Sequence, residues 1–345
     1  MAERELPQAD FAELTVLEAE FEDAELEIIR KAEALHAPIY RKRAEVIARI
    51  PHFWSLVFEQ TPPEIDNFIQ PSDSAVFADC LETFDVSRFE LEDPNGSPRS
   101  FSLKFGFSDN EYFEDRVLEK KFWFRKAKDW TGIVSEPVLI HWKKGKDLTG
   151  GLTDAAYNLF EARKKLGTDT SDGKARKRET QLPEHKILAH KIEKSLESSI
   201  SFFGLFAFVS GYRWVSAEES QKVTREAKEK LEKVQQGVKM EGSEDEDDDS
   251  PEEHHQEVEV FAGGDEVVTI IVEDMWPNAI KYYKSTWDEE EDDEDLSELE
   301  VSESEMMMDH EDDESDTDTK VDIRALVGKG RKSDQSPPAK KQRQE

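Results

Sequence analysis

Apolar residues recur every seven positions near the start of the chain, and this spacing predicts a long helix over residues 11–50. Glu and Arg flank the apolar positions, as in helices that pair with one another. Lys31 interrupts the pattern, and Pro38 predicts a kink rather than an end because helix-forming residues resume after it. A helix of about 60 Å is too long for one small domain to cover, which favours a second copy of the chain as partner over a helix lying on its own domain. The predicted dimerisation positions are Leu14, Leu17, Phe21, Ala24, Ile28 and Leu35.

After Pro51 the pattern predicts short helices and then strands. The helices are expected at residues 52–58, 64–69 and 74–81, between Pro-rich turns. Large apolar residues then alternate with polar or small ones from Phe101 to Phe107, which predicts a half-buried strand. The turn sequence Asp93-Pro94-Asn95-Gly96 joins it to a preceding strand. With that strand at 83–92 and two more at 117–125 and 137–142, the expected class is α+β with an antiparallel sheet and flanking helices.

The second half of the chain alternates between polar stretches and short patterned segments. Residues 143–183 are polar and basic in patches, and we expect a long loop excursion. Helices are expected at 184–195, 201–209 and 217–236, a strand at 267–272 and a short segment at 276–283. The predicted domains are a tail at 1–10, the long helix at 11–50, a folded domain at 51–287 with a charged insertion at 210–262, an acidic disordered tail at 288–319 and a basic tail at 320–345.

Negative charge is concentrated in two runs that contain no Lys or Arg. The net charge is −34, and residues 288–319 hold 19 Asp and Glu while residues 241–260 hold 11. Runs of like charge repel themselves and commonly serve as interaction tails. Their natural partner is strongly cationic. DNA as their ligand and anionic lipid as their docking surface are both disfavoured, because each is itself negatively charged.

Several classes of function find no support in the sequence. No Gly-x-Gly-x-x-Gly, Walker A, HExxH or CxxC pattern occurs, and the eight His are scattered, so neither an enzyme nor a metal or cofactor site is expected. The lone Cys80 lies in an apolar context and is expected to be a core residue in a reducing compartment. No stretch of 18 apolar residues exists, and the first ten residues lack the apolar region of a signal peptide.

The C-terminus carries two basic clusters about seven residues apart. This pattern predicts a bipartite nuclear localisation signal read by a nuclear import receptor, and hence a nuclear protein able to shuttle with the cytoplasm. A basic tail folding back onto the acidic run is the alternative, and the two are compatible. The predicted signal residues are Arg331, Lys332, Lys340, Lys341 and Arg343.

Five segments, in order along the chain, resemble the NAP/SET family of nucleosome assembly proteins, and more closely its SET branch. They are Pro38–Trp54, Asn110–Leu118, Ile140–Thr149, Ser201–Phe203 and Asp274–Tyr283, followed by an acidic tail. The resemblance implies a homodimer in which paired long helices carry an "earmuff" domain at each end. It also implies a histone chaperone that binds core histones through acidic residues on the underside of the earmuff.

The resemblance also implies site residues. Histone binding maps to Asp265, Glu266, Glu273 and Asp274, and a weak DNA contact maps loosely to Lys143, Lys144 and Lys146. Relative to the shorter SET pattern, residues 210–262 are an insertion that the resemblance leaves without a role. A second hypothesis stays open, in which the chain regulates an enzyme, as a phosphatase inhibitor or as a histone acetyltransferase cofactor. A plain acidic spacer is disfavoured by the heptads and the strand alternation.

Overall fold

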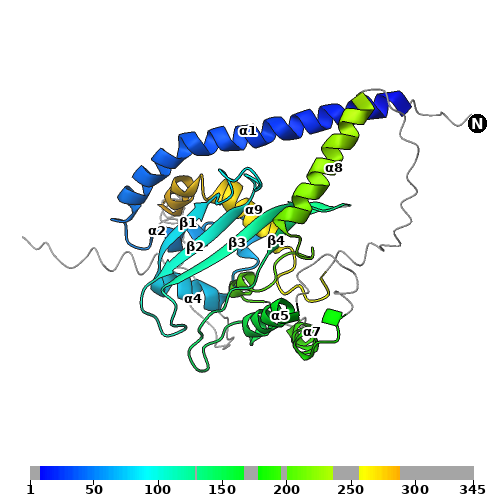
Figure 1. Cartoon of the computed structure of the whole chain (residues 1–345). Helices are drawn as coiled ribbons and strands as arrows, with labels where there is room; N and C mark the ends of the chain where they lie inside the picture. The colour runs from blue at the N-terminus through cyan, green and yellow to red at the C-terminus, as the bar shows by residue number, and fades with distance from the viewer. Residues whose placement is uncertain (1–7, 129, 167–177, 196–199, 236–255, 288–345) are drawn as a thin grey trace, which may run out of the picture.

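The long N-terminal helix forms as expected. The computed structural model describes residues 8–128, 130–166, 178–195, 200–235 and 256–287. Helix α1, Gln8–Ile47, runs along one side of the molecule and curves gently (Figure 1). It passes through Pro38 without ending. One face of α1 lies toward its own domain, so the helix does cover that domain as well as leaving a face exposed.

The sheet is an antiparallel meander in the order β1-β2-β3-β4, which confirms the predicted class. Its strands are β1, Leu81–Ser87; β2, Phe101–Phe107; β3, Val117–Lys126; and β4, Thr131–Ser135. The apolar alternation in β2 is real, because Phe101, Leu103, Phe105 and Phe107 are all buried while Lys104 is exposed. These side chains form the sheet's contribution to the core.

The prediction of the fourth strand at 137–142 is wrong. A tight turn, in which the amide of Ala127 donates to the carbonyl of Trp130 at 2.8 Å, returns the chain at once and pairs residues 131–135 with β3. The later alternation of Val138, Ile140 and Trp142 has another cause. The amide of Val138 donates to Phe206 at 2.7 Å, and Trp142 makes only an isolated bridge with Phe113. This segment packs on the core beside the sheet instead of extending it.

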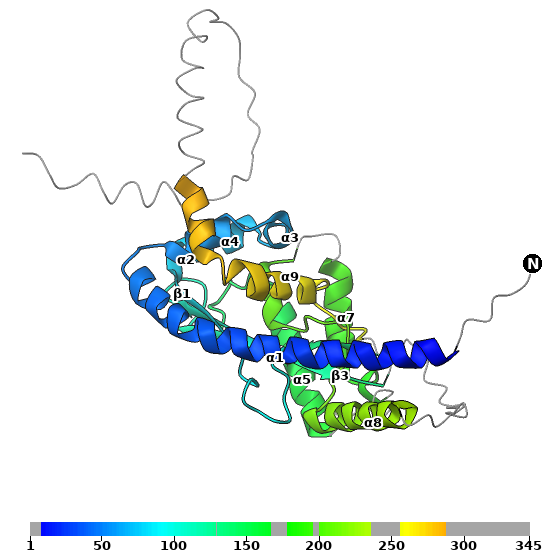
Figure 2. The same ribbon diagram turned by 90° about the horizontal axis from the view of Figure 1, so that it is seen from above.

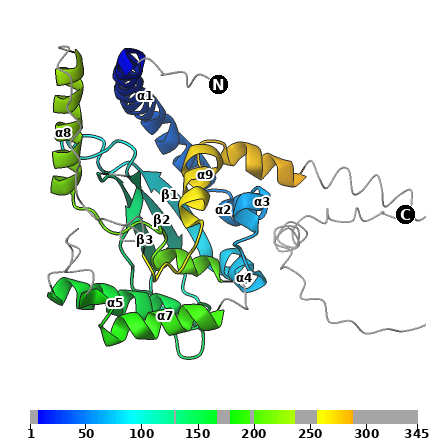
Figure 3. The same cartoon turned by 90° about the vertical axis from the view of Figure 1, so that its right-hand side faces the viewer.

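Helices pack on one face of the sheet, and the other face is largely exposed, with α8 contacting it at β3. Figure 3 shows α2, α3, α4 and α9 on one side and α8 on the other. Their bounds are α2, Phe53–Glu59; α3, Pro63–Asp66; α4, Pro71–Cys80; and α8, Ala217–Gln235. The segment expected as a helix at 201–209 is instead a 3-10 turn, η1, Phe202–Phe206. The buried Asp73 carboxylate accepts from the Ser201 hydroxyl at 2.5 Å and the Phe202 amide at 2.7 Å, which fastens η1 to α4.

The expected loop excursion at 143–183 contains a helix, so that prediction is wrong for its middle part. Helix α5, Leu152–Leu166, packs against α7, Pro183–Ser195. Its buried residues Leu152, Ala156, Leu159 and Phe160 lie at helical spacing, which the surrounding charge obscured. The end of the first acidic run is folded too. Val258 and Val260 are buried in the same small core, and the amide of Gln256 donates to Gly211 at 2.6 Å.

The expected last strand at 267–272 is helical. Helix α9, Gly264–Ile270, continues into a π-helical turn, η3, Ile271–Met275, and residues 279–287 form a further helix. The run Val-Val-Thr-Ile-Ile-Val favoured a strand by composition, but its buried side chains follow a helical spacing: Val267, Val268, Ile271, Val272 and Met275. Short apolar runs do not distinguish a buried strand from a buried helix.

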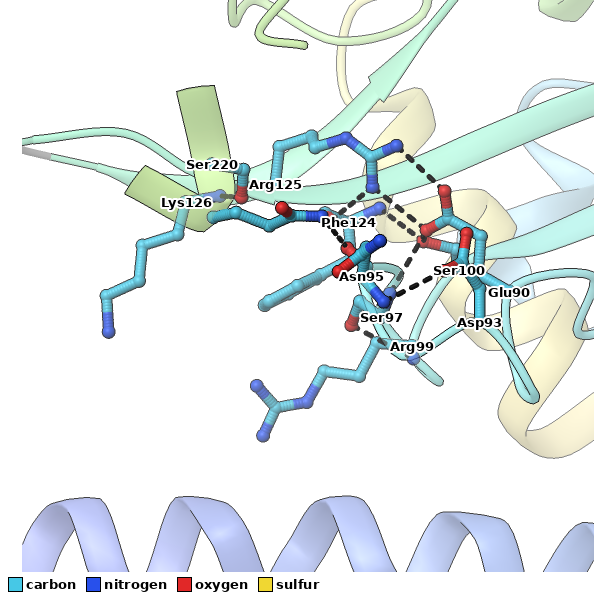
Figure 4. Close-up of polar contacts among 11 residues, drawn as sticks. Glu90, Asp93, Asn95, Ser97, Arg99, Ser100, Phe124, Arg125, Lys126 and Ser220 are labelled. Carbon is cyan, nitrogen blue, oxygen red and sulfur yellow. Dashed lines mark hydrogen bonds and ion pairs between the residues drawn. The ribbon is translucent and has the colours of Figure 1, made fainter. Parts of the chain in front are cut away.

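The loop between β1 and β2 is built around a buried ion pair (Figure 4). Arg125 of β3 donates to both carboxylate oxygens of Glu90, at 2.9 and 2.8 Å, and the two residues are only 4% and 8% exposed. Ser100 and the amide of Ser97 also donate to this carboxylate. Burial alone would raise the pKa of Glu90, but the hydrogen bonds from Arg125, Ser100 and Ser97 outweigh it and lower that pKa. The loop is therefore held rigidly, with Arg99 pointing toward α1.

Within the described part of the chain, no helix combines the length and the apolar character needed to cross a membrane.

Candidate functional site

The four carboxylates expected to bind a cationic partner lie on one helical segment, and one side of that segment is buried in the core. Asp265 and Glu266 are in the first turn of α9, and Glu273 and Asp274 are in η3. We call these four the α9 carboxylates. Glu266, Glu273 and Asp274 are exposed and Asp265 is partly exposed. Because the other face of the segment is buried in the core, the carboxylates are carried on a fixed support rather than on a loop.

Asp274 is oriented by its neighbours. Asn278 donates to its Oδ1 at 2.8 Å, and the Tyr282 hydroxyl donates to its Oδ2. Burial, the hydrogen bond to Asp274 and the nearby charges of Asp274 and Glu64 raise the pKa of Tyr282 to about 12. Glu64 comes from α3. This side of the site therefore gathers two carboxylates from distant parts of the chain.

Glu273 and Glu33 of α1 both act on Arg88. Burial lowers the pKa of Arg88, and the charges of Glu33, Glu273 and Tyr40 act in the opposite direction. Arg88 thus lies in the field of one carboxylate from α1 and one from η3. Its Nη1 also donates to the carbonyl of Pro98 at 3.0 Å.

Asp265 influences the titration of Glu259, a carboxylate that precedes α9. Burial, and next the charge of Asp265, raises the pKa of Glu259 to about 7. Burial is the larger cause and the negative charge of Asp265 the smaller one, and both disfavour the ionised form of Glu259. Glu33 and Glu64 are additional acidic neighbours that the sequence did not single out, because only the tertiary fold brings α1 and α3 near this segment. Glu259, in contrast, belongs to the end of the first acidic run and precedes Asp265 by six residues. Neither Glu33 nor Glu64 stands in an acidic motif that would have marked it in the sequence as part of this site.

The end of α1 and the end of η3 meet in a buried aromatic cluster. Nη1 of Arg43 donates to the carbonyl of Trp276 at 2.5 Å, and its guanidinium lies 4.1 Å from the Trp276 ring and 4.7 Å from the Tyr40 ring. Trp276 stacks on Trp54 with ring centroids 5.3 Å apart. This joint fixes η3, and so Glu273 and Asp274, relative to α1. The segments Pro38–Trp54 and Asp274–Tyr283, which carry two of the family motifs, contact each other at this joint.

The predicted dimerisation positions form an exposed apolar seam on α1, which we define as Leu14, Leu17, Phe21, Ala24, Ile28 and Leu35. All six are exposed, with Phe21 and Leu35 each 71% exposed. Leu26 and Ile29, which lie off the seam, are half-buried, and Arg43 near the C-terminal end of α1 is buried on the chain's own domain. The helix therefore serves two surfaces at once.

The lysines expected to contact DNA are partly engaged within the chain. Nζ of Lys143 donates to the carbonyl of Asn110 at 2.5 Å, and Lys146 pairs with Glu111 at 2.8 Å. That hydrogen bond to Glu111 raises the pKa of Lys146. Lys144 is exposed. Lys143 is exposed as well and Lys146 is partly exposed, so the predicted cluster is accessible to solvent although two of its lysines are engaged within the chain.

Other predicted residues lie elsewhere. Cys80 is buried, its thiol donates to the carbonyl of Val76 at 2.9 Å, and burial raises its pKa to about 12. Among the described residues, no group of three or more His, Cys, Asp or Glu could hold a metal ion. Residues 241–255 of the first acidic run, all of 288–319 and the nuclear localisation residues Arg331, Lys332, Lys340, Lys341 and Arg343 lie outside the described residues.

A family model matches most of the folded chain. The model described as "Nucleosome assembly protein (NAP)" matches residues 47–286. Its match contains α2 through α9, the sheet and all four α9 carboxylates.

Individual proteins are similar over parts of the chain. The Schizosaccharomyces pombe protein C36B7.08c, named as a candidate nucleosome assembly protein, is 34% identical over 173 residues, which cover 47% of this chain and 69% of that protein. Protein SET of Drosophila melanogaster is 29% identical over 150 residues, covering 42% of this chain and 52% of that protein. The chain thus spans about half the length of several curated relatives that it matches. The crystal structure of Vps75 matches with a TM-score of 0.46 and 22% identity, covering 80% of this chain and 97% of that chain.

Proposed function

Because the chain belongs to the nucleosome assembly protein family, we propose that it is a histone chaperone that binds core histones and promotes nucleosome assembly and disassembly. The observation that carries the proposal is the set of α9 carboxylates, which stand on a buried helical support with further carboxylates around them. Such a support holds negative charge in a fixed arrangement, which gives a cationic partner a register. No catalytic step is part of this function.

The mechanism we propose is competition for positive charge. Histones carry dense Lys and Arg that bind DNA tightly and without sequence preference, through release of counterions. The α9 carboxylates would position the histone, and the acidic runs at 241–260 and 288–319 would screen its remaining charge. Binding by charge is sensitive to salt, so histones can still be transferred to DNA.

The carboxylates can be tested by charge removal at constant fold. We compare Asp265→Asn, Glu266→Gln, Glu273→Gln and Asp274→Asn together with a control that removes four carboxylates from α8, namely Glu218, Glu226, Glu229 and Glu232, each changed to Gln. Both variants lose the same charge. Four exposed ion pairs of about 0.2–1 kcal/mol each would change histone affinity by about fourfold to several hundredfold.

The readout is plasmid supercoiling by the full chain with purified core histones and a topoisomerase, together with histone affinity at physiological salt. We expect the α9 variant to lose activity and the α8 control to keep it. Equal losses in both variants would show that only total charge matters. Failure of the unsubstituted chain to bind histones would overturn the proposal.

We further propose that the chain is a homodimer that pairs through the apolar seam of α1. Leu17→Glu with Ile28→Glu should give monomers in sedimentation velocity, because two buried charges would face each other across the pair. Glu18→Gln with Glu27→Gln, one residue from each seam position, is the matched control and should remain dimeric. A dimer in the seam variant would contradict this pairing mode.

A further inference from the structure

Helix α8 lies in the stretch 210–262, for which the family resemblance implies no role. We propose that α8 is a strut that holds the N-terminal half of α1 at a set angle to the domain, and that surface charge latches it. Figure 1 shows α8 rising from the sheet toward the N-terminal part of α1, and Figure 2, from above, shows the two helices side by side there. The structure records contacts of α8 with both β3 and α1.

The base of the strut is attached to the sheet. The amide of Lys126, at the end of β3, donates to the Ser220 hydroxyl at 2.9 Å. Gln221 donates to the carbonyl of Asn95 in the β1–β2 loop at 3.0 Å. Just before α8, Trp214 meets Trp123 of β3 with ring centroids 4.9 Å apart. The base is therefore fixed by neutral hydrogen bonds and an aromatic contact.

The latch is a meeting of three carboxylates on α1 with three basic residues from three elements. Lys228 of α8 lies 3.4 Å from Asp23. Arg99 of the β1–β2 loop pairs with Glu22 at 3.3 Å and with Glu25 at 2.9 Å. Lys126 of β3 lies 3.7 Å from Glu22. The buried Glu90–Arg125 pair keeps the loop that presents Arg99 in place.

The latch lies far along α1 from the buried joint. The buried joint at Arg43 is 20 residues from Asp23, about 30 Å along the helix. With 19 residues, α8 is about 28 Å long. Together α1, α8 and the domain form a triangle, closed at one corner by the aromatic joint and at another by charge. A contact this far from the joint sets the angle of the whole long helix.

The latch is weak enough to open. In the described part of α8 no side chain is fully buried, and both partners of the Lys228–Asp23 pair are exposed. Exposed ion pairs stabilise little and are screened by salt. A single helix of this length is only marginally stable without a surface to dock on. Release of the latch should therefore loosen α8 and the N-terminal half of α1 together.

If the proposed function holds, the strut has a consequence for it. In a dimer paired through α1, the angle of α1 relative to each domain sets the separation of the two sets of α9 carboxylates. The strut would then determine which size of histone assembly fits between them. This last step rests on the proposed function, whereas the strut itself does not.

A charge swap tests the latch in the full chain, without histones. Hydrogen–deuterium exchange is measured over residues 14–28 and 217–233 for Lys228→Asp, for Asp23→Lys and for the double variant. Each single change should speed exchange in both segments about three- to fivefold at low salt, and the double change should restore the original rate. In the unsubstituted protein, 0.5 M salt should speed exchange to a similar degree.

The control is Lys230→Asp, an equal charge change at an exposed position of α8 outside the latch. It should leave exchange at 14–28 unchanged. Failure of the double variant to recover, or equal effects from the control, would overturn the strut. Because histones are absent from this measurement, a chain that fails to bind histones would leave its outcome intact.

Discussion

The two ends of α1 are held to the domain by different chemistry. At the C-terminal end, the buried Arg43 lies against Trp276 and Tyr40 and donates to the carbonyl of Trp276. Toward the N-terminal end, Glu22 and Asp23 meet Arg99, Lys126 and Lys228 at the surface. Buried aromatic contacts depend on packing, whereas exposed ion pairs depend on salt and on the precise placement of long side chains.

One helix is thus attached by a rigid joint at one end and by an adjustable contact at the other. The joint lies beside Glu273 and Asp274, so the candidate binding surface is attached to the rigid end. The adjustable end, at Glu22, Asp23 and Glu25, lies in the same part of α1 as the apolar seam through which the dimer is proposed to form.

The largest effect is expected at the joint. Trp276→Ala should lower the free energy of unfolding by about 3–5 kcal/mol, because it removes the stack on Trp54 and the ring beneath Arg43. Urea unfolding measures it. The control is Trp130→Ala, a half-buried ring stacked on Tyr212 away from α1, which should cost less. Equal losses would remove the distinction between the joint and other aromatic pairs.

A smaller loss of unfolding free energy is expected at the buried Glu90–Arg125 pair, which holds the loop that carries Arg99 of the latch. Arg125→Met should cost about 3 kcal/mol, because it leaves the Glu90 carboxylate buried without its cation. Adding Glu90→Leu should recover part of that loss, since a buried pair replaced by apolar groups is often tolerated. Urea unfolding of both variants checks it, and a double variant less stable than the single one would contradict the account.

The same ion pair predicts a dependence on acid. The pKa of Glu90 is lower in the folded chain than its ordinary value of 4.5, so the carboxylate stabilises the fold above pH 4.5 and this contribution is lost as the pH falls through the folded pKa. The gap in unfolding free energy between the unsubstituted chain and Glu90→Gln should therefore be widest near pH 7 and narrow below pH 4.5. A gap that stays constant down to pH 3 would assign the effect to packing.

The smallest effect is expected for a single member of the latch. Arg99→Gln should lower the free energy of unfolding by about 0.5 kcal/mol at low salt and by nothing measurable at high salt. Arg116→Gln, which loses an exposed pair with Asp109 far from α1, is the control. Only Arg99→Gln should also speed hydrogen exchange in residues 14–28. If both do, or neither, the latch residues are ordinary surface charges.

The sequence predicted a helix or strand well where a single hydrophobic pattern was present. The heptad spacing from Leu14 to Leu35 predicted α1, and the alternation from Phe101 to Phe107 predicted β2, because each pattern spans several repeats. Predictions were wrong where signals competed. The β-branched run in 267–272 outweighed its helical spacing, and the charge around Leu152–Leu166 hid a helix. The four α9 carboxylates were assigned by resemblance, and their role stays a prediction.

By itself the sequence determined the class of the fold, the long helix with its exposed apolar seam and the concentration of negative charge, because these follow from local periodicity and composition. Only the tertiary structure placed Glu33 and Glu64 near the α9 carboxylates, joined Arg43 to Trp276 and set α8 against α1. Those contacts join residues far apart in the chain, and their free energy depends on burial and distance. Neither burial nor distance can be predicted from the local sequence.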